Sequence, residues 1–139
     1  MVQLVGDKMS DKGKRTMKVM IVEDEEDILN LYTHFLSNRG YNVVSRSKDT
    51  NNIVANFENS EPDICLIDYM IGGKCAGINI ATEILEKSPS TPILFTTAYE
   101  PIRTELPRHH EFEDKNIRVL MKPARLYDIE NSMLDMVNN

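Results

Sequence analysis

The stretch Ile64-Cys65-Leu66-Ile67-Asp68 places an acidic residue directly after four consecutive apolar residues. A short, continuous apolar run is typical of a strand that is buried on both faces, as in a parallel sheet. A proline and an aspartate precede this run, and a glycine-containing segment follows it. We therefore predict a buried strand over residues 64–67, with Asp68 at its carboxyl end.

Comparable patterns alternate along the rest of the chain. Apolar runs predict four more strands, and apolar residues at helical spacing predict a helix after most of them. Pro101 and Pro107 leave the segment 100–115 ambiguous, because Pro107 would end or kink a helix. Five strand–helix units in a row imply an α/β fold, a doubly wound five-stranded parallel sheet with helices on both faces. The other strands are expected at 19–22, 41–45, 93–96 and 117–121, and the helices around 28–36, 53–57, 80–85 and 126–137.

Composition narrows the class of protein. The chain has 139 residues, a net charge of −6 and 41% hydrophobic residues, which suits one globular domain. No apolar run approaches the ~20 residues that span a bilayer, and the start lacks a signal-peptide core. We therefore expect a cytoplasmic protein that does not bind membranes, with Cys65 and Cys75 reduced.

Charge is distributed unevenly along the chain. Residues 1–18 contain five basic and two acidic side chains, so the remainder is more acidic than the whole. An acidic domain is not expected to bind nucleic acid, whose phosphates it would repel. We interpret residues 1–16, which show no helical or strand period, as a flexible N-terminal extension, and residues 17–139 as the folded domain.

Chemically active residue types follow four of the predicted strands. Glu23 and Asp24 follow the first strand, Asp68 the third, Thr97 the fourth and Lys122 the fifth. Ligand sites of such sheets lie at the carboxyl ends of the strands, so we expect these side chains to meet. The acids from residue 23 to residue 27 also suit a helix N-terminus, which is the alternative interpretation of that cluster.

The chemistry of this set is coherent. Neighbouring carboxylates resist joint ionisation, and Mg²⁺ removes the conflict because it prefers oxygen ligands. A carboxylate can attack phosphorus to form an aspartyl phosphate. A lysine and a hydroxyl, here Lys122 and Thr97, are suited to neutralise and bind phosphoryl oxygens.

Four segments resemble the receiver domain of two-component response regulators. Residues 19–25 (VMIVEDE) resemble its first strand and acidic pair, and residues 62–70 (PDICLIDYM) its phosphoacceptor strand. Residues 94–98 (LFTTA) resemble its switch strand, and residues 120–123 (LMKP) its lysine strand. The resemblance covers residues 17–139 and implies the flavodoxin-like (βα)5 receiver fold.

The resemblance also implies roles for individual residues. Asp68 would accept a phosphoryl group from a sensor histidine kinase or phosphotransfer protein, with Thr97 and Lys122 binding its oxygens. Glu23, Asp24, Asp68 and the backbone carbonyl of Met70 would hold Mg²⁺, and the bond between Lys122 and Pro123 is commonly cis. We expect a phosphorylation-controlled switch that binds a downstream protein target as a monomer or weak homodimer. It would not be an enzyme, apart from self-catalysed phosphoryl transfer and slow autodephosphorylation, and because no domain follows Asn139 it is expected to stand alone.

The sequence departs from the family pattern at several positions. Glu23 replaces the usual aspartate, the segment 71–77 carries one extra residue, and Val119 replaces an aromatic residue whose role Tyr99 is placed to take. Val119, the altered segment 71–77 and Pro107 support an alternative, a degenerate receiver that binds partners independently of phosphorylation. An aspartate-dependent phosphatase is disfavoured, because Met70 stands where such enzymes carry a proton-donating acid.

Overall fold

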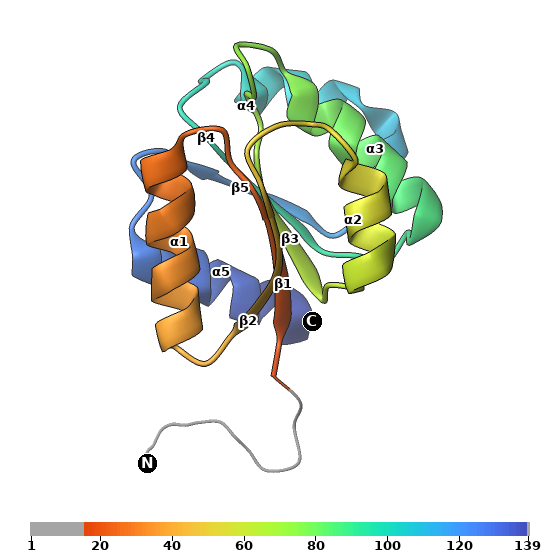
Figure 1. Ribbon diagram of the computed structural model, residues 1–139. Helices are drawn as coiled ribbons and strands as arrows, with labels where there is room; N and C mark the ends of the chain where they lie inside the picture. The colour runs from red at the N-terminus through yellow and green to blue at the C-terminus, as the bar shows by residue number, and fades with distance from the viewer. Residues whose placement is uncertain (1–15, 139) are drawn as a thin grey trace.

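The computed structural model describes residues 16–138 and contains a five-stranded, all-parallel sheet covered by helices on both faces (Figure 1). The strand order is β2-β1-β3-β4-β5, so β1, β3 and β4 are flanked on both sides by other strands. This arrangement confirms the predicted α/β fold. The strands are β1 (Lys18–Val22), β2 (Asn42–Ser47), β3 (Ile64–Asp68), β4 (Ile93–Thr97) and β5 (Ile117–Met121).

Two apolar cores lie on opposite faces of the sheet. Helices α1 (Glu26–Asn38) and α5 (Leu126–Asn138) cover one face, whereas α2 (Ile53–Ser60) and α3 (Ala76–Lys87) cover the other (Figure 1). Successive side chains of a strand point to opposite faces, so one buried strand serves both cores. In β3, Cys65 and Ile67 belong to the α2–α3 core, whereas Ile64 and Leu66 belong to the α1–α5 core.

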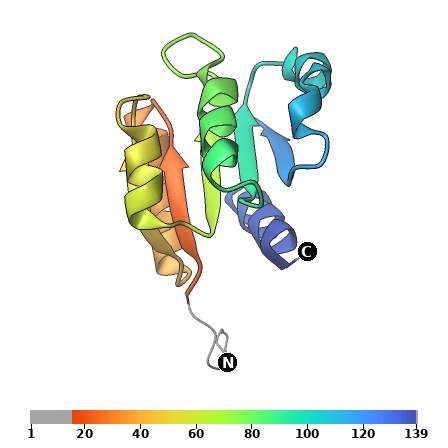
Figure 2. The same ribbon diagram turned by 90° about the vertical axis from the view of Figure 1, so that its right-hand side faces the viewer.

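The ambiguous segment 100–115 forms three short turns instead of one long helix. They are α4 (Ile102–Glu105) and two 3-10 helices, η1 (Leu106–Arg108) and η2 (His110–Phe112). Pro107 lies in η1, where its missing N–H ends the α-helical hydrogen-bond ladder. Ile102 and Phe112 are buried and anchor the segment to the α2–α3 core. Figure 2 shows this segment beside α3.

Helix α3 begins within the glycine-containing segment that follows β3. Gly77 is the second residue of this helix. Its N–H donates to the Tyr69 carbonyl at 2.9 Å, so the helix begins directly against the end of β3. A Cβ at this position would lie 2.8 Å from the Tyr69 Cα, which only glycine avoids.

The predicted N-terminal extension lies mostly outside the described residues, since only Thr16 of the range 1–16 is among them. Among residues 16–138, none of the helices combines the length and apolar character needed to cross a bilayer.

Candidate functional site

The carboxyl ends of the parallel strands bring the predicted site residues to one edge of the sheet. Asp68 is the last residue of β3, Glu23 directly follows β1, and Lys122 directly follows β5. The Lys122 ammonium donates to Glu23 Oε1 at 3.0 Å and to Asp68 Oδ2 at 3.3 Å. Glu23 is only 1% exposed and Asp68 is 6% exposed, so both carboxylates are buried, whereas Lys122 is half-buried. Three residues far apart in sequence thus meet as predicted.

Asp24 completes an acidic cluster with Glu23 and Asp68. One carboxylate oxygen from each of the three residues lies within 4.8 Å of the other two. Asp24 is exposed, and its Oδ2 accepts the N–H of Gly72 at 2.9 Å. Oxygen ligands of this kind match the preference of Mg²⁺, so the donor set fits the predicted ion. The Met70 N–H donates to Asp68 Oδ1 at 3.2 Å, whereas the Met70 carbonyl as a ligand stays a prediction.

Burial sets the electrostatics of this cluster. Burial and the hydrogen bond and charge of Glu23 raise the pKa of Asp68 to about 7, against the opposing effect of Lys122. Burial alone would lower the pKa of Lys122, but the hydrogen bond to Glu23 and the charge of Asp68 raise it overall. Two buried carboxyl groups therefore share one ammonium group. A further positive charge at this position would favour the ionised form of Asp68.

Thr97 ends β4 at the same edge of the sheet, next to a network that the sequence did not reveal. Its Oγ1 accepts the Tyr99 N–H at 3.0 Å. The Tyr99 hydroxyl donates to Glu105 Oε2 at 2.6 Å, and the Tyr99 ring stacks on Tyr69 with 6.0 Å between centroids. Glu105 escaped prediction because it lies in the ambiguous segment 100–115, where no periodic pattern marked it.

The peptide bond between Lys122 and Pro123 is cis, as expected. Val119 packs against the α2–α3 core, so β5 presents an aliphatic side chain where the family has an aromatic one. The segment after Asp68 contains a small turn in which Ile71 pairs with Lys74.

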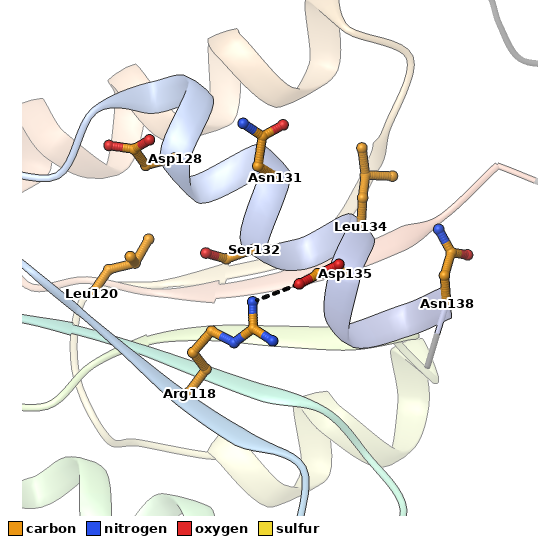
Figure 3. A pocket seen from close by; sticks show the side chains of 8 residues that line it. All are labelled: Arg118, Leu120, Asp128, Asn131, Ser132, Leu134, Asp135 and Asn138. Carbon is orange, nitrogen blue, oxygen red and sulfur yellow. Dashed lines mark hydrogen bonds and ion pairs between the residues drawn. The ribbon is translucent and has the colours of Figure 1, made fainter.

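A separate groove of about 540 Å³ lies between β5 and α5 (Figure 3). Leu120 and Leu134 contribute apolar surface to it, and an ion pair from Arg118 to Asp135 crosses it with 3.2 Å between Nη1 and Oδ2. None of the predicted site residues lines this groove, so it is distinct from the acidic cluster.

The family model of the response regulator receiver domain matches residues 19–132. The alkaline phosphatase synthesis transcriptional regulatory protein PhoP of Bacillus subtilis is 32% identical over 81 residues, which cover 58% of this chain and 33% of that protein. The chain thus spans about a third of the length of this curated relative.

Solved structures show the same fold. A CheY-like receiver domain protein from Methanospirillum hungatei superposes with a TM-score of 0.77 at 18% identity, covering 89% of this chain and 95% of that one. The response regulator PhyR from Brucella abortus gives a TM-score of 0.68 at 23% identity, covering 88% of this chain and 48% of that one.

Proposed function

The chain belongs to the response regulator receiver domain family, and from this premise we propose that it is a phosphoryl-accepting switch of a two-component or phosphorelay pathway. Asp68 would accept the phosphoryl group from a histidine kinase or phosphotransfer protein. The observation that carries this proposal is the buried Asp68 carboxylate beside Glu23, with the Lys122 ammonium 3.3 Å from Asp68 Oδ2. The switch would act by changing the binding of a downstream protein.

The proposed transfer step uses the Asp68 carboxylate as nucleophile. One carboxylate oxygen forms the new bond to phosphorus, and the bond from phosphorus to its donor atom breaks. The donor leaves with that electron pair and takes up a proton from solvent. Lys122 is close enough to Asp68 to pair with a phosphoryl oxygen, and the Thr97 hydroxyl at the same edge is suited to donate to another.

Glu23, Asp24 and Asp68 are the residues that would hold Mg²⁺. When bound, the ion supplies positive charge that offsets repulsion among the carboxylates and the phosphoryl oxygens. Hydrolysis of the resulting acyl phosphate returns Asp68 to its free form, so the chain would turn over its own modification and no other substrate. In this proposal the chain is a switch and not an enzyme that acts on an external substrate.

Intact mass spectrometry tests the assignment directly. The protein is mixed with acetyl phosphate and Mg²⁺, and a single phosphoryl adduct is expected. Substituting Asp68→Asn should abolish the adduct, because an amide is not a competent nucleophile here. The matched control is Asp114→Asn, an exposed aspartate whose neighbour Lys115 is its ion-pair partner, and this variant should be labelled like the wild type. Equal labelling of Asp68→Asn and the wild type would contradict the proposal.

A second candidate is a receiver fold retained for binding alone, independent of phosphorylation. Val119 in β5 and the short α4 of four residues favour it, because both lie where a receiver would transmit its signal. This alternative expects a partner to bind the free and the phosphorylated protein with equal affinity. A change in affinity upon phosphorylation would support the switch instead.

A further inference from the structure

The orientation of the Thr97 hydroxyl depends on the residue two positions later. Thr97 Oγ1 accepts the Tyr99 N–H at 3.0 Å. A hydroxyl group has one proton to donate and two lone pairs to accept with. Because the Tyr99 N–H engages one lone pair, it restrains the hydroxyl and leaves the hydroxyl proton available for another acceptor. The backbone at Tyr99 therefore helps to place a group that the proposed function assigns to phosphoryl binding.

The Tyr99 side chain is itself anchored in the following turn. Its hydroxyl donates to Glu105 Oε2 at 2.6 Å, the length of a charge-assisted bond from a hydroxyl to a carboxylate. Its ring stacks on Tyr69, with 6.0 Å between centroids and 19° between planes. The Tyr69 hydroxyl lies 3.5 Å from Glu105 Oε1. The Glu105 carboxylate at the end of α4 thus interacts with two tyrosines. Tyr69 directly follows Asp68, and Tyr99 lies two residues after Thr97.

The side chain of Val119 in β5 makes no hydrogen bond to Tyr99 or Glu105. This side chain is aliphatic and cannot form a hydrogen bond, and it packs in the α2–α3 core. The shortest polar contact between the residues that follow Thr97 and α4 is the hydrogen bond from the Tyr99 hydroxyl to Glu105, with a longer one from Tyr69 beside it.

We propose that Glu105 is a positioning residue of the phosphoryl site, which acts through Tyr99 to hold the Thr97 hydroxyl in place for a phosphoryl oxygen. The inference rests on the proposed function, because it assigns Thr97 that role.

The rate of adduct formation from acetyl phosphate and Mg²⁺ tests this inference. Glu105→Ala and Tyr99→Phe should each slow the reaction by about threefold to tenfold, because loss of the tether leaves Thr97 less well positioned. Glu105→Gln retains an acceptor for the Tyr99 hydroxyl and should restore part of the rate. The double variant should be no slower than the slower single variant, because both changes remove the same bond. The matched control is Glu100→Gln, an exposed acid that pairs with Arg103, and it should react like the wild type.

A Thr97→Ala background separates positioning from general destabilisation. In that background Glu105→Ala should cause no further slowing, since the hydroxyl that it positions is gone. Additional slowing there, or unchanged rates in Glu105→Ala and Tyr99→Phe, would overturn the inference while the proposed function stands. Absence of any adduct on the wild-type protein would instead overturn the proposed function. Tyr99→Phe removes one oxygen atom only, so it keeps the test valid if Glu105→Ala fails to fold.

Discussion

At the scale of single residues, the neighbours of Asp68 are expected to set the lifetime of its phosphoryl group. Met70 is two residues after Asp68, and its backbone N–H contacts the carboxylate at 3.2 Å. Its thioether lies 3.4 Å from the Cys75 thiol, so the side chain is part of a sulfur-rich, weakly polar wall. Neither Met70 nor Cys75 carries an acid or an amide that orients water for attack on phosphorus.

Substituting Met70→Asn should therefore accelerate loss of the phosphoryl group. The amide can hold a water molecule near phosphorus, and we expect a shorter half-life by about tenfold, a modest part of what positioned polar groups contribute to such steps. The half-life is measured by intact mass after the phosphoryl donor is removed. Met70→Leu is the control and should keep the wild-type half-life, and equal half-lives for the Asn and Leu variants would contradict the argument.

The residues of the site differ in how far the sequence predicts them. Asp68 ends the buried strand β3, Glu23 directly follows the buried strand β1, and Lys122 directly follows the half-buried β5, so the strand pattern alone places them at one edge of the sheet. Glu105 was not predicted, because its position depends on how α4 folds back toward Tyr99. A contact of this kind is set by tertiary packing and leaves no periodic signal in the sequence.

At the scale of elements, the junction between β3 and α3 depends on Gly77. Helix propensity alone would favour alanine there by about 1 kcal/mol. The structure predicts that alanine destabilises the protein instead, because its Cβ would lie 2.8 Å from the Tyr69 Cα and 3.0 Å from the Tyr69 carbonyl oxygen. Overpacking of this severity costs about 1–3 kcal/mol, so Gly77→Ala should lower the free energy of unfolding.

Urea denaturation measures this effect, with Gly73→Ala as a comparison. Gly73 has a φ of +76°, and a Cβ added there would have no neighbouring atom within 4 Å. Alanine at this position would therefore strain the backbone without a steric clash. Gly73→Ala should cost about 1–2 kcal/mol through that strain alone. If Gly77→Ala instead stabilised the protein, helix propensity would outweigh the contact with Tyr69 and our account of the junction would be wrong.

The elements themselves were predicted with unequal success, for physical reasons. β3 and β4 are buried at every position, and their continuous apolar runs made them visible in the sequence. β2 extends to Ser47, beyond the predicted end at residue 45, because an edge strand continues by backbone pairing with β1 where its side chains are polar. The turns from α4 to η2 were not predicted, because Pro107 breaks the helical period and few of their side chains, chiefly Ile102 and Phe112, are buried in the core.

At the scale of the whole molecule, folding concentrates negative charge in an already acidic protein. The chain has a net charge of −6, and the parallel sheet brings Glu23, Asp24 and Asp68 within reach of one ion. In the unfolded chain Glu23 and Asp68 are far apart, so their repulsion arises only in the folded state. The same arrangement that suits phosphoryl transfer therefore costs stability, and a ligand that binds only the folded cluster should recover it.

Mg²⁺ should accordingly raise the free energy of unfolding. A ligand that binds only the folded state adds about 1.4 kcal/mol at ten times its dissociation constant. Urea denaturation with and without Mg²⁺ measures the gain, with potassium salt at matched ionic strength as the control for screening. Asp24→Asn should reduce the gain, because it removes one carboxylate ligand. Asp114→Asn, an exposed aspartate outside the cluster, should respond to Mg²⁺ like the wild type. An equal gain from potassium, or an undiminished gain in Asp24→Asn, would mean that general screening stabilises the protein and that the acidic cluster is not a magnesium site.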